Sequence, residues 1–185
     1  MKQSAYGLVL FIFMALPPVA RVMESIMIVH MHMQMPLLAI SGFMMARYFQ
    51  IRFPRFFEKW NGNGIPGMLL FAIIGIYWML PRAMDDSLES FDVELFKFIS
   101  LSLLAGVPLR DSWGKVSYAV KCALFAGFTL IFIGMGLLYT IAPVQLCNNY
   151  LLIEQITLGW GFLTTAICMV VYMIYHAVTR HSAYE

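Results

Sequence analysis

One stretch of the chain combines residues that could do chemistry with a strongly apolar background. Between Arg21 and Arg47 the sequence RVMESIMIVHMHMQMPLLAISGFMMAR is apolar enough to cross a bilayer. Its first half interleaves four polar residues with methionines, namely Glu24, His30, His32 and Gln34 among Met23, Met27, Met31, Met33 and Met35. Ionisable groups inside a membrane span are rare and mark a functional site by default. Thioethers beside imidazoles favour copper, above all Cu(I), over other metals.

Helical phase divides these candidates into two sets. One helix face carries residues spaced by four, three and four positions, namely Met23, Met27, His30 and Gln34. His32 points roughly the other way, with Met35 beside it, so one helix presents both imidazoles to one ion only if Pro36 unwinds it. We therefore expect a metal site at His30 with Met23 and Met27, and His32 with Met35 is the other choice.

An acidic segment further along the chain offers oxygen donors to such a site. It holds five carboxylates within ten residues, namely Asp85, Asp86, Glu89, Asp92 and Glu94. We take Asp85 and Asp86 as candidate ligands, although such a run is also typical of a solvated loop. The same alternative applies to the apolar stretch, because its methionines could serve simple packing and its two histidines could be hydrogen-bonded structural groups.

Haem and thiol chemistry are weaker interpretations. A bis-histidine haem needs two imidazoles on facing helices at one depth, whereas both candidate histidines lie on one helix. A haem with one His and one Met ligand, or one shared with a partner subunit, stays open. The three cysteines, at positions 122, 147 and 168, form no CxxC motif, which disfavours a thiol–disulfide oxidoreductase. No nucleophile–base constellation or Gly-rich phosphate loop is evident, so we expect no enzyme.

The composition indicates which class of protein positions these groups. Of 185 residues, 61% are hydrophobic and 12% are charged, and the mean hydropathy is +0.78, whereas a soluble domain has about 25% charged residues. We therefore expect an all-α integral membrane protein with a single transmembrane domain. The apolar runs predict a bundle of six transmembrane helices, at approximately residues 6–20, 22–45, 65–80, 93–107, 116–142 and 151–178.

The charges between these spans predict their orientation. With the N-terminus inside, nine of the twelve Lys and Arg residues fall on the inner side, namely Lys2, Arg47, Arg52, Arg55, Lys59, Arg110, Lys115, Lys121 and Arg180. The outer side keeps Arg21, Arg82 and Lys97. By the positive-inside rule both termini are then cytoplasmic. His30 and His32 consequently lie in the outer half of the bilayer, on the same side as the acidic segment.

Several short motifs carry a family resemblance. The motif VHMHMQMPLLAISG resembles the HM-repeat and PLL element of the CtaG family, and WMLPRAMDD, LLAGVPLRDSW and QLCNNYLLIEQ are similar to elements of small CtaG-like proteins. The CtaG family consists of bacterial membrane proteins linked to copper insertion into haem–copper oxidases. The resemblance implies that His30, His32 and Met35 correspond to the His/Met element of that family. The chain departs from the family in having fewer spans and fewer histidines.

These observations together predict a copper-handling assembly protein of the bacterial inner membrane. It would capture Cu(I) in the outer half of the membrane and deliver it to a respiratory oxidase, as in cytochrome c oxidase assembly. Its partners would be membrane lipid and another membrane protein or oxidase subunit, with no nucleic acid. The alternative is a non-catalytic accessory subunit of a large respiratory or oxidative membrane complex. A transporter is a weaker alternative, because paired charges near mid-membrane and inverted repeats are not evident.

Overall fold

The computed structural model describes residues 2–181, with side chains through residue 179, and this part of the chain is helical without any strand. The elements, in chain order, are α1 (Lys2–Ala15), α2 (Pro17–Glu24), α3 (Met27–Val29), the π-helix η1 (His30–Gln34), α4 (Met35–Arg52), α5 (Pro54–Asn61), α6 (Ile65–Tyr77), α7 (Pro81–Glu89), α8 (Phe91–Ile99), the π-helix η2 (Ser100–Gly106), α9 (Val107–Trp113), α10 (Tyr118–Ile141) and α11 (Leu152–His181). The all-α class expected from the composition is therefore confirmed.

Several of these helices are long and apolar enough to cross a membrane. Three meet this description by length and composition, namely Met27–Arg52, Tyr118–Ile141 and Leu152–Thr179. Two bent pairs raise the number to as many as five: α1 with α2, which meet at 70°, and α6 with α7, which meet at 75°. By length and composition the structure thus supports three to five spans, where the apolar runs predicted six. The expected span 93–107 lies in the helical run from Phe91 to Trp113, which is not among these apolar helices. This run contains more charged residues than any of them.

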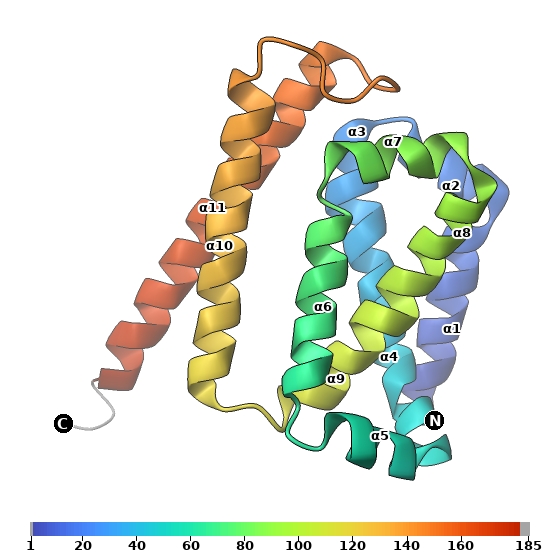
Figure 1. Ribbon diagram of the computed structural model, residues 1–185, viewed down its shortest axis with the longest axis vertical. Helices are drawn as coiled ribbons and strands as arrows, with labels where there is room; N and C mark the ends of the chain where they lie inside the picture. The colour runs from blue at the N-terminus through green and yellow to red at the C-terminus, as the bar shows by residue number, and fades with distance from the viewer. Residues whose placement is uncertain (1, 182–185) are drawn as a thin grey trace.

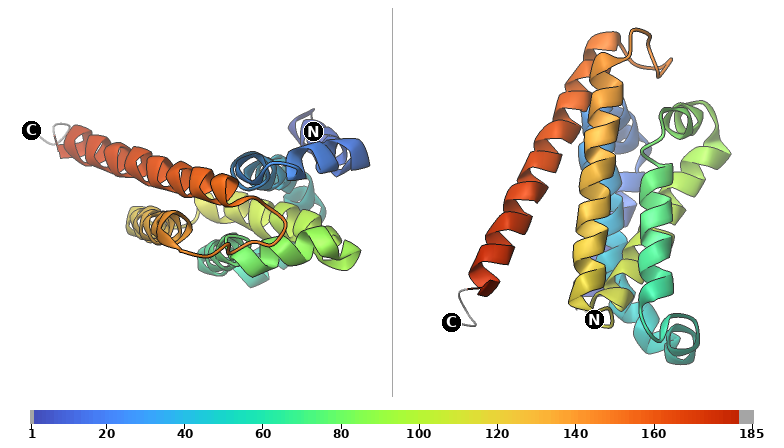
Figure 2. Two further views of the ribbon diagram at one scale, coloured as in Figure 1. Left: turned by 90° about the horizontal axis from the view of Figure 1, so that it is seen from above. Right: turned by 60° about the vertical axis from the view of Figure 1, so that its left-hand side comes forward.

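The elements form a four-membered bundle with a helical hairpin beside it. Figure 1 shows α1, α4, α6 and the α8–α9 run standing side by side, while α2 and α7 close one end and α5 closes the other. The hairpin of α10 and α11 stands at the edge of this bundle, as the view from above in Figure 2 shows. Helix α1 begins and helix α11 ends at the same end of the molecule, the end covered by α5.

Each π-helix ends two residues before a proline, which is the second residue of the next helix. Pro36 and Pro108 lack the N–H that would continue an α-helical ladder, and their rings clash with the carbonyl four residues earlier. The chain absorbs this by widening into a π-turn, in which Met35 N–H donates to the His30 carbonyl and Val107 N–H donates to the Ser102 carbonyl. The sequence raised the possibility that Pro36 unwinds the helix, and the structure has a π-helix over residues 30–34.

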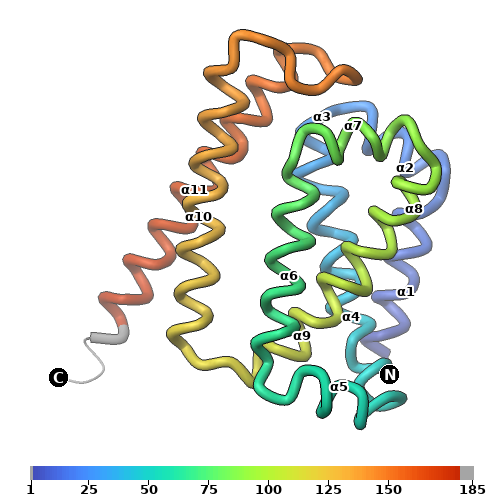
Figure 3. The backbone as a smooth tube through the Cα atoms, viewed as in Figure 1, coloured from blue at the N-terminus to red at the C-terminus, as the bar shows by residue number. Residues whose placement is uncertain are grey.

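The two π-containing helices approach each other very closely. Figure 3 shows the α8–α9 run crossing α4 obliquely, and η2 packs against α4 along this crossing. An added Cβ atom on Gly42 would lie 1.7 Å from the Ser102 carbonyl oxygen, and one on Gly106 would lie 2.1 Å from the Ala39 carbonyl oxygen. The Ser41 and Ser102 hydroxyls lie 3.2 Å apart at this contact. Small residues thus set the helix spacing, as they do in membrane bundles.

We predict that Gly42→Ala destabilises the protein and that Gly134→Ala does not. The added methyl on Gly42 overlaps backbone atoms of Ser102, and overpacking of a close contact costs about 1–3 kcal/mol or more. Gly134 is a matched control because a Cβ atom there meets nothing within 4 Å. Thermal unfolding of both variants in the same detergent measures the difference. Equal melting temperatures would contradict the close contact between α4 and η2.

Candidate functional site

Five polar side chains come together where α2, η1 and α8 meet the loop before α11. We call them the buried polar cluster, and its members are Glu24, His30, Gln34, Lys97 and Tyr150. The side chains of His30, Gln34 and Lys97 are fully buried, and Tyr150 is 5% exposed. A cluster of ionisable groups this deeply buried in an apolar chain is the strongest candidate for a functional site.

An ion pair lies at the centre of the cluster. Lys97 Nζ lies 2.6 Å from Glu24 Oε1, and the two side chains are 0% and 11% exposed. The same ammonium lies 3.2 Å from His30 Nε2. Gln34 Nε2 donates a second hydrogen bond, of 3.2 Å, to the Glu24 carboxylate. Burying an ammonium group away from water is costly unless it is paired and hydrogen-bonded, and these contacts meet that requirement.

The hydrogen bonds assign the tautomer of His30. The Tyr150 hydroxyl donates to the Glu24 backbone carbonyl at 2.6 Å, which uses its only proton. His30 Nδ1, 2.9 Å from the Tyr150 oxygen, must therefore carry the proton and donate it. Nε2 is then the lone-pair nitrogen and accepts from Lys97. The imidazole is neutral, and both of its nitrogens are engaged with groups of this chain.

Local sequence explains why these side chains meet. The chain breaks helical structure at Ser25 and Ile26, so that α2 lies across the end of the bundle and brings Glu24 over η1. The π-turn that Pro36 imposes places His30 and Gln34 on the side of the helix that faces α8. In α8, Lys97 lies between Phe96 and Phe98 in the sequence, and its side chain points toward Glu24 and His30.

Asp85 anchors the loop that supplies Tyr150. The Asn148 backbone N–H donates to Asp85 Oδ2 at 2.8 Å, and the Asn149 side chain lies 3.4 Å from Oδ1. Gln155 holds the other side of the loop by accepting from the Leu146 N–H at 2.7 Å. The loop over residues 142–151 is therefore fixed to α7 and α11, and Tyr150 is held in place rather than free to swing.

Cys147 lies in the same loop, and its thiol is unreactive. It is fully buried, and its thiol donates a long hydrogen bond to the Pro81 carbonyl. Burial, together with the nearby Asp85 carboxylate, raises the pKa of this thiol to about 12. With this pKa Cys147 stays protonated at neutral pH and packs as a small apolar side chain. Because the thiolate is the form that attacks or binds metal, the protonated thiol does neither.

The two histidines of the apolar stretch lie against different elements. His30 faces Lys97 and Tyr150, whereas the His32 ring packs on Phe162 of α11, with ring centroids 4.8 Å apart. His32 Nε2 lies 3.4 Å from the Thr165 hydroxyl, and its Nδ1 is buried without a hydrogen-bond partner. The structure therefore does not bring both imidazoles to one point.

The other predicted ligands have structural surroundings. Met27 and Met35 are buried members of the hydrophobic core, and Met23 is partly buried against it. Both oxygens of Asp85 accept hydrogen bonds from the loop before α11, while Asp86 is exposed. Among the side chains that the structure describes, residues 2–179, no group of three or more His, Cys, Asp or Glu is placed to hold a metal ion.

A metal ion does not fit the buried polar cluster in this arrangement. Metal binding at His30 requires a free ring nitrogen, and here Nδ1 carries a proton while Nε2 accepts from an ammonium group. Lys97 also supplies the positive charge that Glu24 needs. A metal ion would have to displace Lys97 before it could reach either donor.

Lys97 and Tyr150 are the residues that sequence reasoning missed. The positive-inside count assigned Lys97 to the outer side of the membrane but gave it no partner, whereas in the structure its side chain is fully buried in the bundle. A signal was present, because Lys97 lies among apolar residues of one expected span and Glu24 lies in the apolar stretch of another. Two opposite charges in apolar spans are candidates to pair with each other. Tyr150 had no comparable signal, because its role depends on how a loop more than a hundred residues away folds back.

The comparisons with known proteins give no relatives. The chain matches no protein-family model, no curated protein and no solved structure.

We predict strong energetic coupling between Lys97 and Glu24. Lys97→Met should lower the unfolding free energy by about 3–5 kcal/mol, because it leaves the Glu24 carboxylate buried without its counter-ion. Adding Glu24→Gln should restore part of this loss, because the double variant buries no net charge. Titration with a denaturing detergent measures all three variants.

The Lys115–Asp111 pair provides the matched control for this cycle. It has the same 2.6 Å separation, but the lysine is 31% exposed. Asp111 is itself only 4% exposed, but it also accepts hydrogen bonds from Gln50 and Asn61, which remain when the lysine is removed. Lys115→Met should therefore cost less than Lys97→Met, because water reaches this pair and the carboxylate keeps other donors. Additive effects of Lys97→Met and Glu24→Gln would show that the buried pair is not coupled.

Proposed function

We propose that this chain is a non-catalytic subunit or assembly partner of a larger complex in a bacterial inner membrane. The observation that carries the proposal is that the ionisable groups of the buried polar cluster are satisfied within the chain, although Gln34 Oε1 has no hydrogen-bond partner among the described residues. Each ring nitrogen of His30, the Lys97 ammonium and the Glu24 carboxylate bond to groups of this chain. A catalytic or transport site needs polar groups that a substrate can reach, and these groups serve one another.

The exposure of the helical hairpin supports a role in binding another membrane protein. In the span Met27–Arg52, 44% of the most apolar window is buried, whereas the value is 22% for both α10 and α11. Both helices therefore offer most of their apolar surface to lipid or to a neighbouring protein. Their place at the edge of the bundle leaves this surface open on the side away from α1 (Figure 2).

We propose six spans with both termini in the cytoplasm. The end of the molecule covered by α5 carries basic residues at the end of α4, in α5, before α10 and in the first turn of α10, namely Arg52, Arg55, Lys59, Lys115 and Lys121. The positive-inside rule then directs this end to the cytoplasm. In this orientation the buried polar cluster lies toward the outer face. The resemblance to CtaG proteins suggests a respiratory oxidase as the partner complex.

Photocrosslinking in native membranes tests the proposal. A photoreactive residue at Ile167 or Val171, which share an exposed face of α11, should give an adduct with one membrane protein of defined mass. The same residue at Leu158, which is fully buried, should give no such adduct. Adducts with lipid alone at exposed positions along both α10 and α11 would overturn the proposed role.

Copper handling is the second candidate function. It is favoured by the donors around the Lys97 ammonium, because Glu24 Oε1 and His30 Nε2 would face one point if Lys97 turned away. On this candidate the reduced, anaerobic protein binds copper in stoichiometric amount, and His30→Ala removes it while His176→Ala does not. Elemental analysis measures the copper. Absence of copper from both the wild-type protein and Lys97→Met would reject the candidate.

A further inference from the structure

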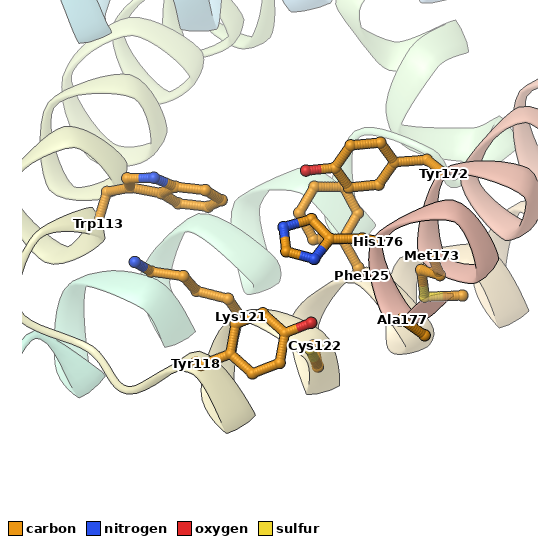
Figure 4. Close-up of a pocket in the computed structure, with 9 residues that line it drawn as sticks. All are labelled: Trp113, Tyr118, Lys121, Cys122, Phe125, Tyr172, Met173, His176 and Ala177. Carbon is orange, nitrogen blue, oxygen red and sulfur yellow. The ribbon is translucent and has the colours of Figure 1, made fainter. Parts of the chain in front are cut away.

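A pocket of about 380 Å³ lies between α9, α10 and α11, far from the buried polar cluster. It is located near the start of α10, where α11 has diverged from its partner helix (Figure 1). We call it the hairpin pocket, and the residues that matter here are Trp113, Lys121, Phe125, Tyr172, Met173 and His176. Figure 4 shows these side chains arranged around a common space.

Lys121 brings a positive charge to this pocket and forms no ion pair with a described carboxylate. Its ammonium lies 5.2 Å from the centroid of the Trp113 ring. The ion pairs of the described residues are Lys97 with Glu24 and Lys115 with Asp111, so no described acid lies within 4 Å of Lys121. A cation in this setting retains its capacity to bind an anion, and the partial desolvation of the pocket strengthens such a bond.

His176 presents an unsatisfied hydrogen-bonding atom to the same region. Its Nδ1 atom is buried and has no hydrogen-bond partner among the described residues. The ring is held between Tyr118 and Tyr172, with centroid distances of 5.7 and 5.8 Å. Buried polar atoms usually have a partner, so a ligand oxygen that accepts from this ring is the missing component. In Figure 4 the His176 ring and the Lys121 amine lie on two sides of the central space.

The rest of the pocket is apolar. Phe125, Met173 and Ala177 line it beside the aromatic rings. The outer surfaces of both hairpin helices continue this apolar character, since Leu130 and Val171 are largely exposed. A ligand that suits the whole site has an anionic oxygen group joined to long apolar chains.

We propose that the hairpin pocket binds the phosphate of an anionic phospholipid. Lys121 pairs with the phosphate, His176 donates a hydrogen bond to a phosphate oxygen, and the acyl chains lie along the exposed faces of α10 and α11. Basic pockets between membrane helices on the cytoplasmic side bind acidic headgroups in this way. A choline headgroup is disfavoured, because its own positive charge would lie close to the Lys121 ammonium.

Titration of the delipidated, detergent-purified protein with phosphatidylglycerol tests this site. Thermal stabilisation by phosphatidylglycerol should saturate, and phosphatidylcholine should give at most a small shift. Lys121→Gln should weaken binding about tenfold, as expected for loss of one charge-assisted hydrogen bond, and His176→Gln should weaken it less. Lys59→Gln is the matched control, because it removes an exposed charge from α5 at the same end of the molecule.

The outcomes separate the possible sources of the phosphate. Stabilisation by inorganic phosphate at the same concentration, lost in Lys121→Gln, would overturn the lipid in favour of a free anion. Equal stabilisation by both lipids, or equal effects of Lys121→Gln and Lys59→Gln, would overturn the site itself. Because detergent solution contains neither leaflets nor a partner protein, these results are independent of the proposed orientation and of the proposed complex.

Discussion

The buried ion pair between Lys97 and Glu24 is the interaction on which the arrangement of this protein depends. It joins α2 to α8, two helices that are far apart in the sequence, and it extends through His30 and Tyr150 to η1 and to the loop before α11. An ammonium group with no exposed surface cannot be tolerated in an apolar bundle without these partners. Every element that meets at this end of the molecule is therefore fixed by one requirement, which is to neutralise and solvate a single charge.

The two prolines explain how the helices reach this geometry. Each interrupts the α-helical ladder, and each is preceded by a π-helix that rotates the following turn. The first π-helix carries His30 and Gln34 to the ion pair. The second forms the close contact of Gly106 and Ser102 with α4, where no larger side chain than glycine fits at position 42. The buried polar cluster and the close helix crossing thus both depend on a π-helix before a proline, which occurs in each of two neighbouring helices.

The two ends of the molecule differ in whether their polar groups bond within the chain, which favours a structural role for one end and a binding role for the other. At the end that holds the buried polar cluster, Glu24, His30 and Lys97 bond to one another or to Tyr150, and Asp85 holds the loop that supplies Tyr150. At the other end the hairpin helices separate and leave a cationic, aromatic pocket in which Lys121 pairs with no acid among the described residues. A rigid end beside an open hairpin is consistent with a subunit that holds its own shape and meets lipid or protein through α10 and α11.

The sequence by itself determined the class of protein, since its hydropathy and its low charge content leave an apolar helical bundle as the only compact solution. It also pointed to the stretch around His30, because ionisable groups in an apolar run are visible without a structure. Only the tertiary structure decided what those groups do. The charge count alone gave Lys97 a side of the membrane but no partner, and helical phase alone grouped His30 with Met23 and Met27, because neither pattern contains the distance between segments. The fold brings Lys97 across seventy-three positions to Glu24 and Tyr150 across one hundred and twenty to His30. A side chain's partners in a bundle depend on which helices become neighbours, and that is a property of the packed chain.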